Sequence, residues 1–378
     1  MFKARKVWCG TLVAVGFLLS FNINTLAQDH SDHHNHEHHV ATETPVEHHE
    51  DHQDEHHEEE GFNPTEMIMH HVTDAHEWHI LDYTNDAGEE VAVSLPLPII
   101  LYTDGNLDVF MSSGFHHGES SVVKGDREYV LNHGHIEEVN GASILDLSIT
   151  KNVASMLLGA FLLLWIFTAV ARAYSKRNNQ APKGLQSFME PLILFVRDDI
   201  AIPNIGEAKY HRFMPFLLTV FFFIWFNNLL GLIPFFPGGA NLTGNIAVTM
   251  VLAAITLILT NVNGNKDYWK HIFNTPGVPW WLKFPLPLMP AVEFVGVLAK
   301  PFALMIRLFA NITAGHIIIL SLISLIFIFK SLAVAPVAVG FVLFMNVLEL
   351  LVAALQAYIF TLLSALFIGS AVAEHEHH

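Results

Sequence analysis

Long apolar runs separated by short polar segments fill the chain from residue 152 onward. About 20 apolar residues cross ~30 Å of hydrocarbon. The runs over 153–174, 213–236 and 246–262 therefore predict three membrane-spanning helices. Two longer runs follow, over 288–329 and 334–372. The pattern predicts an all-α polytopic membrane protein with about five transmembrane helices.

The last two runs are about twice as long as a bilayer requires, because a helix rises ~1.5 Å per residue. Each run could form two short spans joined by a tight turn, or one long helix. Neither run has an Asn, Gly or Asp cluster at its middle to make that turn. Tilting is the usual response to excess apolar length. We therefore expect a long, tilted, antiparallel C-terminal helix pair.

The chain begins with the features of a targeting signal. Lys3, Arg5 and Lys6 form a basic start, Val7 to Phe21 is an apolar core, and the residues up to Ala27 fit a cleavage site. Residues 1–27 are therefore predicted to be a signal peptide. An uncleaved anchor helix is the alternative, and the short apolar core argues against it.

A low-complexity tract occupies residues 28–60, with twelve acidic residues and eleven histidines between Asp29 and Glu60. It has too few apolar residues to offset the entropy of ordering and should be disordered. His and acids at short spacing could bind a metal ion, but a disordered run fixes no geometry, so we predict no dedicated metal site. The tract accounts for much of the net charge of −17, which is therefore no indication of a nucleic-acid partner. The ending at 374–378 is predicted to be a solvated tail.

Residues 61–150 differ from both neighbours because they contain short runs rich in β-forming residues, separated by Gly, Asn and Asp turns. The runs are 78–83, 91–102, 107–111 and 128–131. We predict a small extracytoplasmic β-containing segment. Four histidines lie near its start, at His70, His71, His76 and His79, and we expect them at the surface; His76 and His79 could also share a helix face.

Basic residues alternate between the ends of the predicted spans. Four follow the first span between Arg172 and Lys183, and three follow the third between Lys266 and Lys283. The turn over 237–239 has none. The positive-inside rule then places the mature N-terminus outside and the C-terminus in the cytoplasm. The mixed segment 185–212 is predicted to be amphipathic and to lie at the membrane surface.

Polar residues are few within the two long runs, and ionisable groups at membrane depth usually mark an ion path. Glu293, Lys300, Arg307 and Asn311 are spaced by 7, 7 and 4 residues and should share one helix face. His316 lies nine residues after Arg307, about half a turn away, and should face the opposite side. In the last run Glu349, Gln356 and Asn346 complete the set, and the first two are seven residues apart.

These residue types differ in whether they can exchange protons. Arginine stays protonated, whereas Glu and His exchange protons near neutral pH. Arg307 could thus attract a carboxylate and make it release its proton, while His316 and Glu349 pass protons to and from water. The alternative, an Arg307 that snorkels to an interface, is disfavoured by the apolar sequence on both sides.

Three stretches resemble subunit a of the F-type ATP synthases: Arg307–His316, Glu349–Phe360 and Asn227–Pro234. They occur in order and at separations similar to those of the family, and the resemblance extends over residues 154–373. The signal peptide, the His-rich tract and the soluble segment are not part of the general family pattern.

The resemblance implies a role for each matching residue. Arg307 resembles the stator arginine that faces the carboxylates of the rotating c-ring. Asn311, His316, Glu349 and Gln356 match polar positions of the proton path, chiefly in the half-channel open to the outside. Glu293 matches an acidic position of the cytoplasmic half-channel. Some members carry Glu at position 316 and His at 349, as expected if the two side chains meet. Gly231 stands where some members have an acid, so no role is assigned to it.

The function implied is that of a proton-conducting stator subunit in the bacterial inner membrane, not catalytic by itself and without a cofactor. Its expected partners are the c-ring, subunit b, the other F0 and F1 subunits and the lipid bilayer. No GxxxxGK[ST] loop is present, so ATP chemistry would belong to the partners. Sodium coupling stays open. A metal-ion transporter is the alternative, but a fixed arginine would repel a mobile cation.

Overall fold

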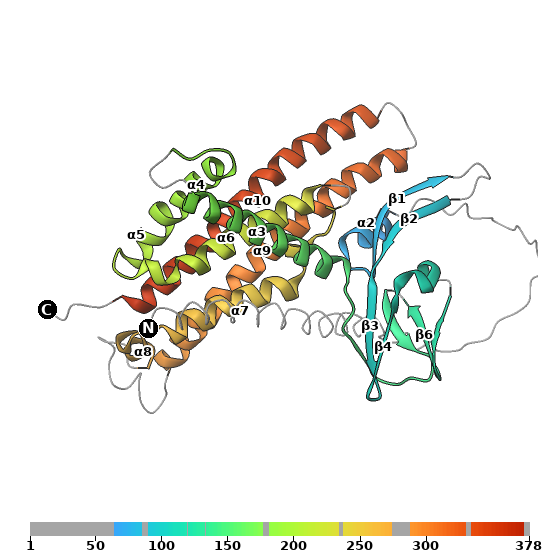
Figure 1. Ribbon diagram of the computed structural model, residues 1–378, viewed down its shortest axis with the longest axis horizontal. Coiled ribbons are helices and arrows are strands. Elements are labelled where there is room, and N and C mark those ends of the chain that lie inside the picture. The colour runs from blue at the N-terminus through green and yellow to red at the C-terminus, as the bar shows by residue number, and fades with distance from the viewer. Residues whose placement is uncertain are drawn as a thin grey trace, which may run out of the picture.

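A computed structural model describes residues 64–84, 90–118, 120–132, 134–176, 181–233, 237–273, 288–329 and 334–373 (Figure 1). The predicted signal peptide, the His-rich tract and the C-terminal tail lie outside these residues. The described chain forms a β-rich part followed by a helical part. In Figure 1 the β-rich part lies at one end of the helical bundle.

The β-rich part has one helix, a 3₁₀ helix and eight strands within the described residues. The strands pair into three small antiparallel sheets with the orders β1-β2, β4-β3-β8 and β5-β6-β7. The elements are α2 (Pro64–Val72), β1 (Glu77–Thr84), β2 (Glu90–Pro96), β3 (Pro98–Thr103), β4 (Asn106–Met111), η2 (Ser112–Gly118), β5 (Val122–Lys124), β6 (Arg127–Asn132), β7 (His135–Glu138) and β8 (Ile144–Asp146).

A small core and a tight turn organise these sheets. Ile99 and Leu101 alternate inward along β3, are fully buried, and pack with Phe115 and Tyr129. The turn after β3 has positive φ at Asp104 (48°) and Gly105 (83°), as a two-residue hairpin turn requires. The predicted run 91–102 is in fact two strands, β2 and β3, which belong to different sheets.

The expectation that His76 lies at the surface is wrong. His76 is 6% exposed, and its Nε2 lies 2.9 Å from Oδ2 of Asp146. The suggested helix face shared with His79 is also wrong, because His79 is in strand β1 and His76 precedes it. A carboxylate 70 residues away accounts for the burial of this histidine, since a buried polar ring needs a partner.

The helical part contains four helices that are long and apolar enough to cross a membrane: α3, α6, α9 and α10. Helix α7 bends by 104° into α8, and the two together make a fifth candidate. The protein is therefore a mostly helical, multi-pass membrane protein. The elements are α3 (Lys151–Lys176), α4 (Leu185–Phe195), the π-helical turn η3 (Val196–Ala201), α5 (Ile202–Ile205), α6 (Tyr210–Leu232), η4 (Leu242–Gly244), α7 (Ile246–Val262), α8 (Lys266–Phe273), α9 (Leu288–Phe329) and α10 (Ala335–Val372).

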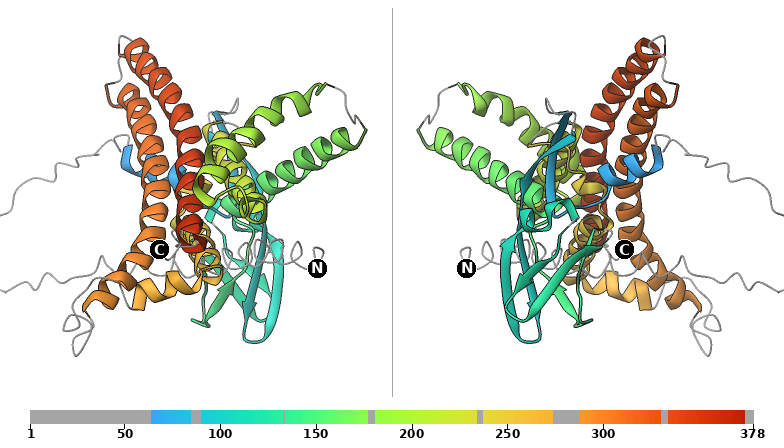
Figure 2. Two further views of the ribbon diagram at one scale, coloured as in Figure 1. Left: turned by 90° about the vertical axis from the view of Figure 1, so that its left-hand side faces the viewer. Right: turned by 90° about the vertical axis from the view of Figure 1, so that its right-hand side faces the viewer.

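Helices α9 and α10 are each continuous, over 42 and 38 residues. The expectation of two long helices rather than four short ones is confirmed. Figure 2 shows them side by side as the orange and red pair, with the green helices α3 and α4 as a separate arm. Much of the pair's surface is apolar and exposed, as expected of helices that meet lipid or another membrane subunit.

Part of the segment 185–212, for which the sequence predicted an amphipathic stretch at the membrane surface, contributes to the main apolar core. Met189, Val196 and Ile200 are fully buried in the main core, which they share with Leu217 of α6 and Ala365 of α10. Val196 and Ile200, on either side of the charged residues of the π-helical turn, thus leave water by packing against the other helices.

Candidate functional site

Two contacts fix how α9 and α10 face each other. The amide Nε2 of Gln356 donates to the main-chain carbonyl of Arg307 at 2.9 Å. Nδ1 of His316 lies 2.8 Å from Oε1 of Glu349. From Arg307 to His316 the chain advances nine residues along α9, whereas from their partners Gln356 to Glu349 it goes back seven residues along α10. The two helices are therefore antiparallel. The structure brings four of the six predicted site residues into two layers.

His316 has an acceptor near each ring nitrogen. Besides Glu349, Nδ1 lies 3.1 Å from the carbonyl of Ile312, and Nε2 lies 3.4 Å from the carbonyl of Gly231 in α6. A proton on either nitrogen therefore finds an acceptor. Glu349 is 4% exposed, and neither of its carboxylate oxygens makes a hydrogen bond within the described chain, so Oε1 meets His316 only as a close ion-pair contact. This pair can hold and exchange a proton.

Gly315 makes room for the Glu349 carboxylate. A Cβ at position 315 would lie 2.7 Å from Oε1 and 2.9 Å from Cδ of Glu349. Real Cβ atoms do not approach other atoms so closely, so the carboxylate, which is the end of a flexible side chain, would have to move from its place beside His316. The absence of a side chain at Gly315 is thus a condition for the His316–Glu349 contact.

Arg307 points away from this pair. Its side chain is exposed, as are those of Asn311 and Lys300, while Glu293 is half-buried. In the described part of the chain the guanidinium makes no hydrogen bond or ion pair. An exposed Arg307 and a His316 that faces Gly231 of α6 agree with the spacing argument, which set the two residues on opposite faces. Asn311 and Glu293 are not brought into contact with the His316–Glu349 pair.

A polar layer that the sequence did not reveal joins α6, η4 and α10. The hydroxyl of Thr243 donates to Oδ1 of Asn228 at 2.5 Å, and the amide of Asn228 lies 3.4 Å from the carbonyl of Ala353. All three residues are buried. Asn228 lies in the stretch Asn227–Pro234 named above. The two consecutive asparagines in an apolar span could have indicated a buried polar layer.

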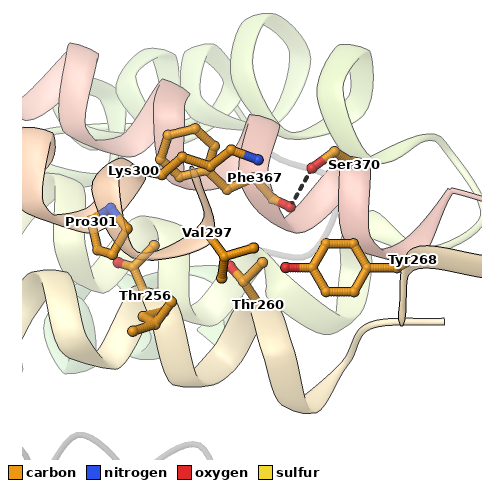
Figure 3. Close-up of a pocket in the computed structure, with 9 residues that line it drawn as sticks. Thr256, Thr260, Tyr268, Val297, Lys300, Pro301, Phe367 and Ser370 are labelled. Carbon is orange, nitrogen blue, oxygen red and sulfur yellow. Dashed lines mark hydrogen bonds between the residues drawn. The ribbon is translucent and has the colours of Figure 1, made fainter. Parts of the chain in front are cut away.

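A pocket at the opposite end of the helices was also missed by the sequence (Figure 3). Its lining carries hydroxyl groups and Lys300, whose Nζ lies 5.6 Å from the ring centre of Phe367. Glu293 lies one helical turn before Val297, which lines the pocket, so Glu293 is on that side of α9. The polar lining residues are Thr256, Thr260, Tyr268, Lys300 and Ser370.

No cluster of three or more His, Cys, Asp or Glu residues suited to a metal ion occurs among the residues that the structure describes. The candidate site thus consists of the exposed Arg307, the half-buried His316 beside the buried Glu349, and the polar layer around Asn228.

Family models and curated relatives match most of the described chain. The family model described as ATP synthase A chain matches residues 153–369, and a domain of unknown function matches residues 67–154. ATP synthase subunit a of Chloroherpeton thalassium is 50% identical over 246 residues, which are 64% of this chain and 70% of the relative. That of Myxococcus xanthus is 47% identical over 252 residues, 65% of this chain and 80% of the relative.

Proposed function

Because this chain belongs to the ATP synthase A chain family, we propose that Arg307 is its stator charge and that His316 and Glu349 form its proton entrance. The protein is a proton-translocating subunit of the F0 stator and a member of the ATP synthase complex. The family leaves the metal-ion transporter interpretation without support. Residue roles, the c-ring contact and orientation are parts of the proposal.

The observation that carries the proposal is the position of Arg307. A permanent charge on an exposed, largely apolar helix face is costly unless a partner of opposite charge meets it. Its own described chain supplies no such partner. A carboxylate on a moving c-ring would fill that need, would lose its proton near Arg307, and would thereby be kept from carrying protons straight across. Asn311, one turn away on the same face, adjoins this contact.

The entrance is proposed at the level of His316 and Glu349. Protons arrive from outside, pass between the imidazole and the buried carboxylate, and reach the ring beside Asn311. The buried layer of Asn228 and Thr243 offers further donors and acceptors along this route. Gln356 is bonded to the main chain of Arg307, so it marks the end of this route nearest the arginine.

The exit is proposed at the pocket that contains Lys300. Its hydroxyl groups can order water, and Glu293 lies one turn beyond it on α9. Residue 293 is fourteen positions from Arg307, or roughly 21 Å along a helix, so the two half-channels stay separate. Protons released from the ring on this side would leave past Glu293 to the cytoplasm.

Orientation follows from charge. The end of α10 lies beside Lys209 and Asn265, at the bundle end that carries the basic residues, and we place this end in the cytoplasm of a bacterial inner membrane. The β-rich segment is then extracytoplasmic, and residues 151–373 form the membrane domain. Helices α9 and α10 lie tilted beside the c-ring. Subunit b and the remaining F0 and F1 subunits complete the complex.

The test is Arg307→Ala in a reconstituted complex, with Arg172→Ala as the matched control. Arg172 is also exposed but lies near the end of α3. We expect ATP-driven proton pumping to disappear in the first variant and to persist in the second, at equal amounts of assembled complex. Pumping that survives Arg307→Ala would falsify the assignment.

A further inference from the structure

The β-rich segment reaches the membrane part through Trp78. This residue of β1 is 4% exposed, and its indole Nε1 donates to the carbonyl of Gly238 at 3.1 Å. Gly238 belongs to the connection between α6 and α7, 160 positions further along the chain. A buried tryptophan whose N–H is bonded to another segment is a strong docking contact, since it combines large buried area with a directional bond.

The segment that Trp78 holds continues to the proton entrance. A Cβ at Gly238 would lie 2.6 Å from the carbonyl of Leu230, so the turn is pressed against the end of α6. Two residues later, the carbonyl of Ala240 lies 3.1 Å from where a Cβ of Gly231 would be. The carbonyl of Gly231 in turn lies 3.4 Å from Nε2 of His316. The 237–240 turn thus lies between Trp78 and the end of α6, which carries the carbonyl that meets His316.

A second attachment lies four residues before Trp78. Asp74 accepts from the main-chain N–H of Asn152 at 3.0 Å and from the hydroxyl of Thr150 at 2.8 Å, at the start of α3. The N–H of Lys151 donates to the carbonyl of Ala75. Free N–H groups at a helix start need acceptors, and a carboxylate suits that positive end. Residues 74–78 are therefore held on two sides.

We propose that the β-rich segment is a positioning element of the proton entrance, in which Trp78 holds the 237–240 turn against α6 and so fixes the carbonyl that meets His316. Trp78 itself touches no proton carrier and acts through Gly238 and Gly231. The inference deepens the proposed function and rests on His316 being part of the entrance. It assigns a task to the region that matches the domain of unknown function.

The test is Trp78→Phe in the complete complex, reconstituted in vesicles, with Tyr129→Phe as the matched control. Phenylalanine keeps a ring but loses the donor. Tyr129 is also fully buried in the β-rich segment and loses one hydroxyl, whose bonds go to Asp108 and Thr103, away from the turn. ATP synthesis is measured against the proton concentration on the entrance side, which gives a maximal rate and a half-saturating concentration.

We expect Trp78→Phe to raise the half-saturating proton concentration about threefold to tenfold, the range set by one hydrogen bond, with little change in the maximal rate per complex. Tyr129→Phe should leave that concentration unchanged. A purely structural contact would only lower the amount of complex and the maximal rate. Equal behaviour of the two variants, or a change in maximal rate alone, overturns the proposal.

Two further measurements make the outcome independent of assembly. In a chain with Cys9→Ser and Ala240→Cys, a membrane-impermeant maleimide should label the buried position 240 faster after Trp78→Phe, and not after Tyr129→Phe. Unchanged labelling counts against the proposal. The variant His316→Ala distinguishes the proposed entrance from the positioning role of Trp78. If His316→Ala leaves ATP synthesis intact, the proposed entrance is wrong. If His316→Ala abolishes synthesis but Trp78→Phe changes nothing, only the positioning role is refuted.

Discussion

Gln356 binds Arg307 through the main-chain carbonyl and not through the guanidinium. A carbonyl oxygen has two lone pairs, so it can accept this bond while also serving the backbone of α9. The partner helix thereby fixes the position of the arginine without engaging its charge. This arrangement fits the proposed contact with a c-ring carboxylate, because the guanidinium stays free to meet a partner that arrives and leaves.

The His316–Glu349 contact predicts that the two residues can exchange places. His316→Glu combined with Glu349→His keeps one imidazole and one carboxylate at 2.8 Å. Each single variant puts two like groups together, and we expect ATP-driven proton pumping to fall at least tenfold in each. The double variant should recover part of that loss, because neighbouring residues are not additive. Losses that simply add would count against a direct pair.

Gly315→Ala should disable the entrance while leaving the complex assembled. The added methyl would meet the Glu349 carboxylate at 2.7 Å and displace it from His316. Gly296→Ala is the control, because the same methyl in the same helix meets nothing within 4 Å. We expect proton pumping to drop severalfold in the first variant and to stay near the parent level in the second. Equal activities would show that the carboxylate can move without cost.

If the Lys300 pocket is the proposed exit, water should reach helix α7 at the residues that line it. Thr256 lines the pocket, whereas Thr249 of the same helix does not, and both are buried. In a Cys9→Ser chain, Thr256→Cys should react with silver ions added on the cytoplasmic side, and the reaction should block proton transport. Thr249→Cys is expected to stay active under the same treatment. Similar sensitivity of both positions would argue against a pocket-specific route.

Low pH should lower the stability of the β-rich segment, because it protonates Asp146. Burial acts to raise the pKa of this carboxyl, but hydrogen bonds and charge from His76, with Ser148, lower it below its ordinary value of 3.8. The folded form thus binds the proton less readily than the unfolded form. The stability that Asp146 contributes is present above pH 3.8 and is lost as pH falls through the folded-state pKa.

Asp146→Asn should remove that pH dependence and cost about 1–3 kcal/mol at pH 5, as expected for a hydrogen bond to a charged group. Hydrogen exchange of the amides at 144–146, compared at pH 5 and pH 3, measures it. Asp126→Asn, at an exposed turn, is the control and should behave as the parent. A parent chain whose exchange shows no stability loss between these pH values would refute the assignment.

Sequence pattern predicted most of the helical part because apolar length alone decides it. The first span was expected over 153–174 and α3 covers Lys151–Lys176. The second was expected to reach 236, yet α6 ends at Leu232, shortly before Pro234, since the residue preceding a proline avoids helical geometry. The apolar residues continue to 236, so composition alone predicted a longer helix than the proline allows.

The site was predicted less completely, and the reason is distance along the chain. Arg307, His316 and Glu349 are rare polar residues in apolar runs, so composition marks them. Trp78 and Gly238 look ordinary in sequence, because their contact arises only when segments 160 positions apart pack together. The Lys300 pocket likewise needs residues from four helices.

The end of α10 has a mechanical consequence. The carbonyl of Val372 accepts from Nζ of Lys209 and from the amide of Asn265, both at 2.8 Å. Under the proposed contact with a c-ring, a sideways force on Arg307 would act on α9 and, through Gln356, on α10. Because the end of α10 is bonded to the starts of α6 and α8, that force would be shared by the whole bundle and would not bend the helix pair alone.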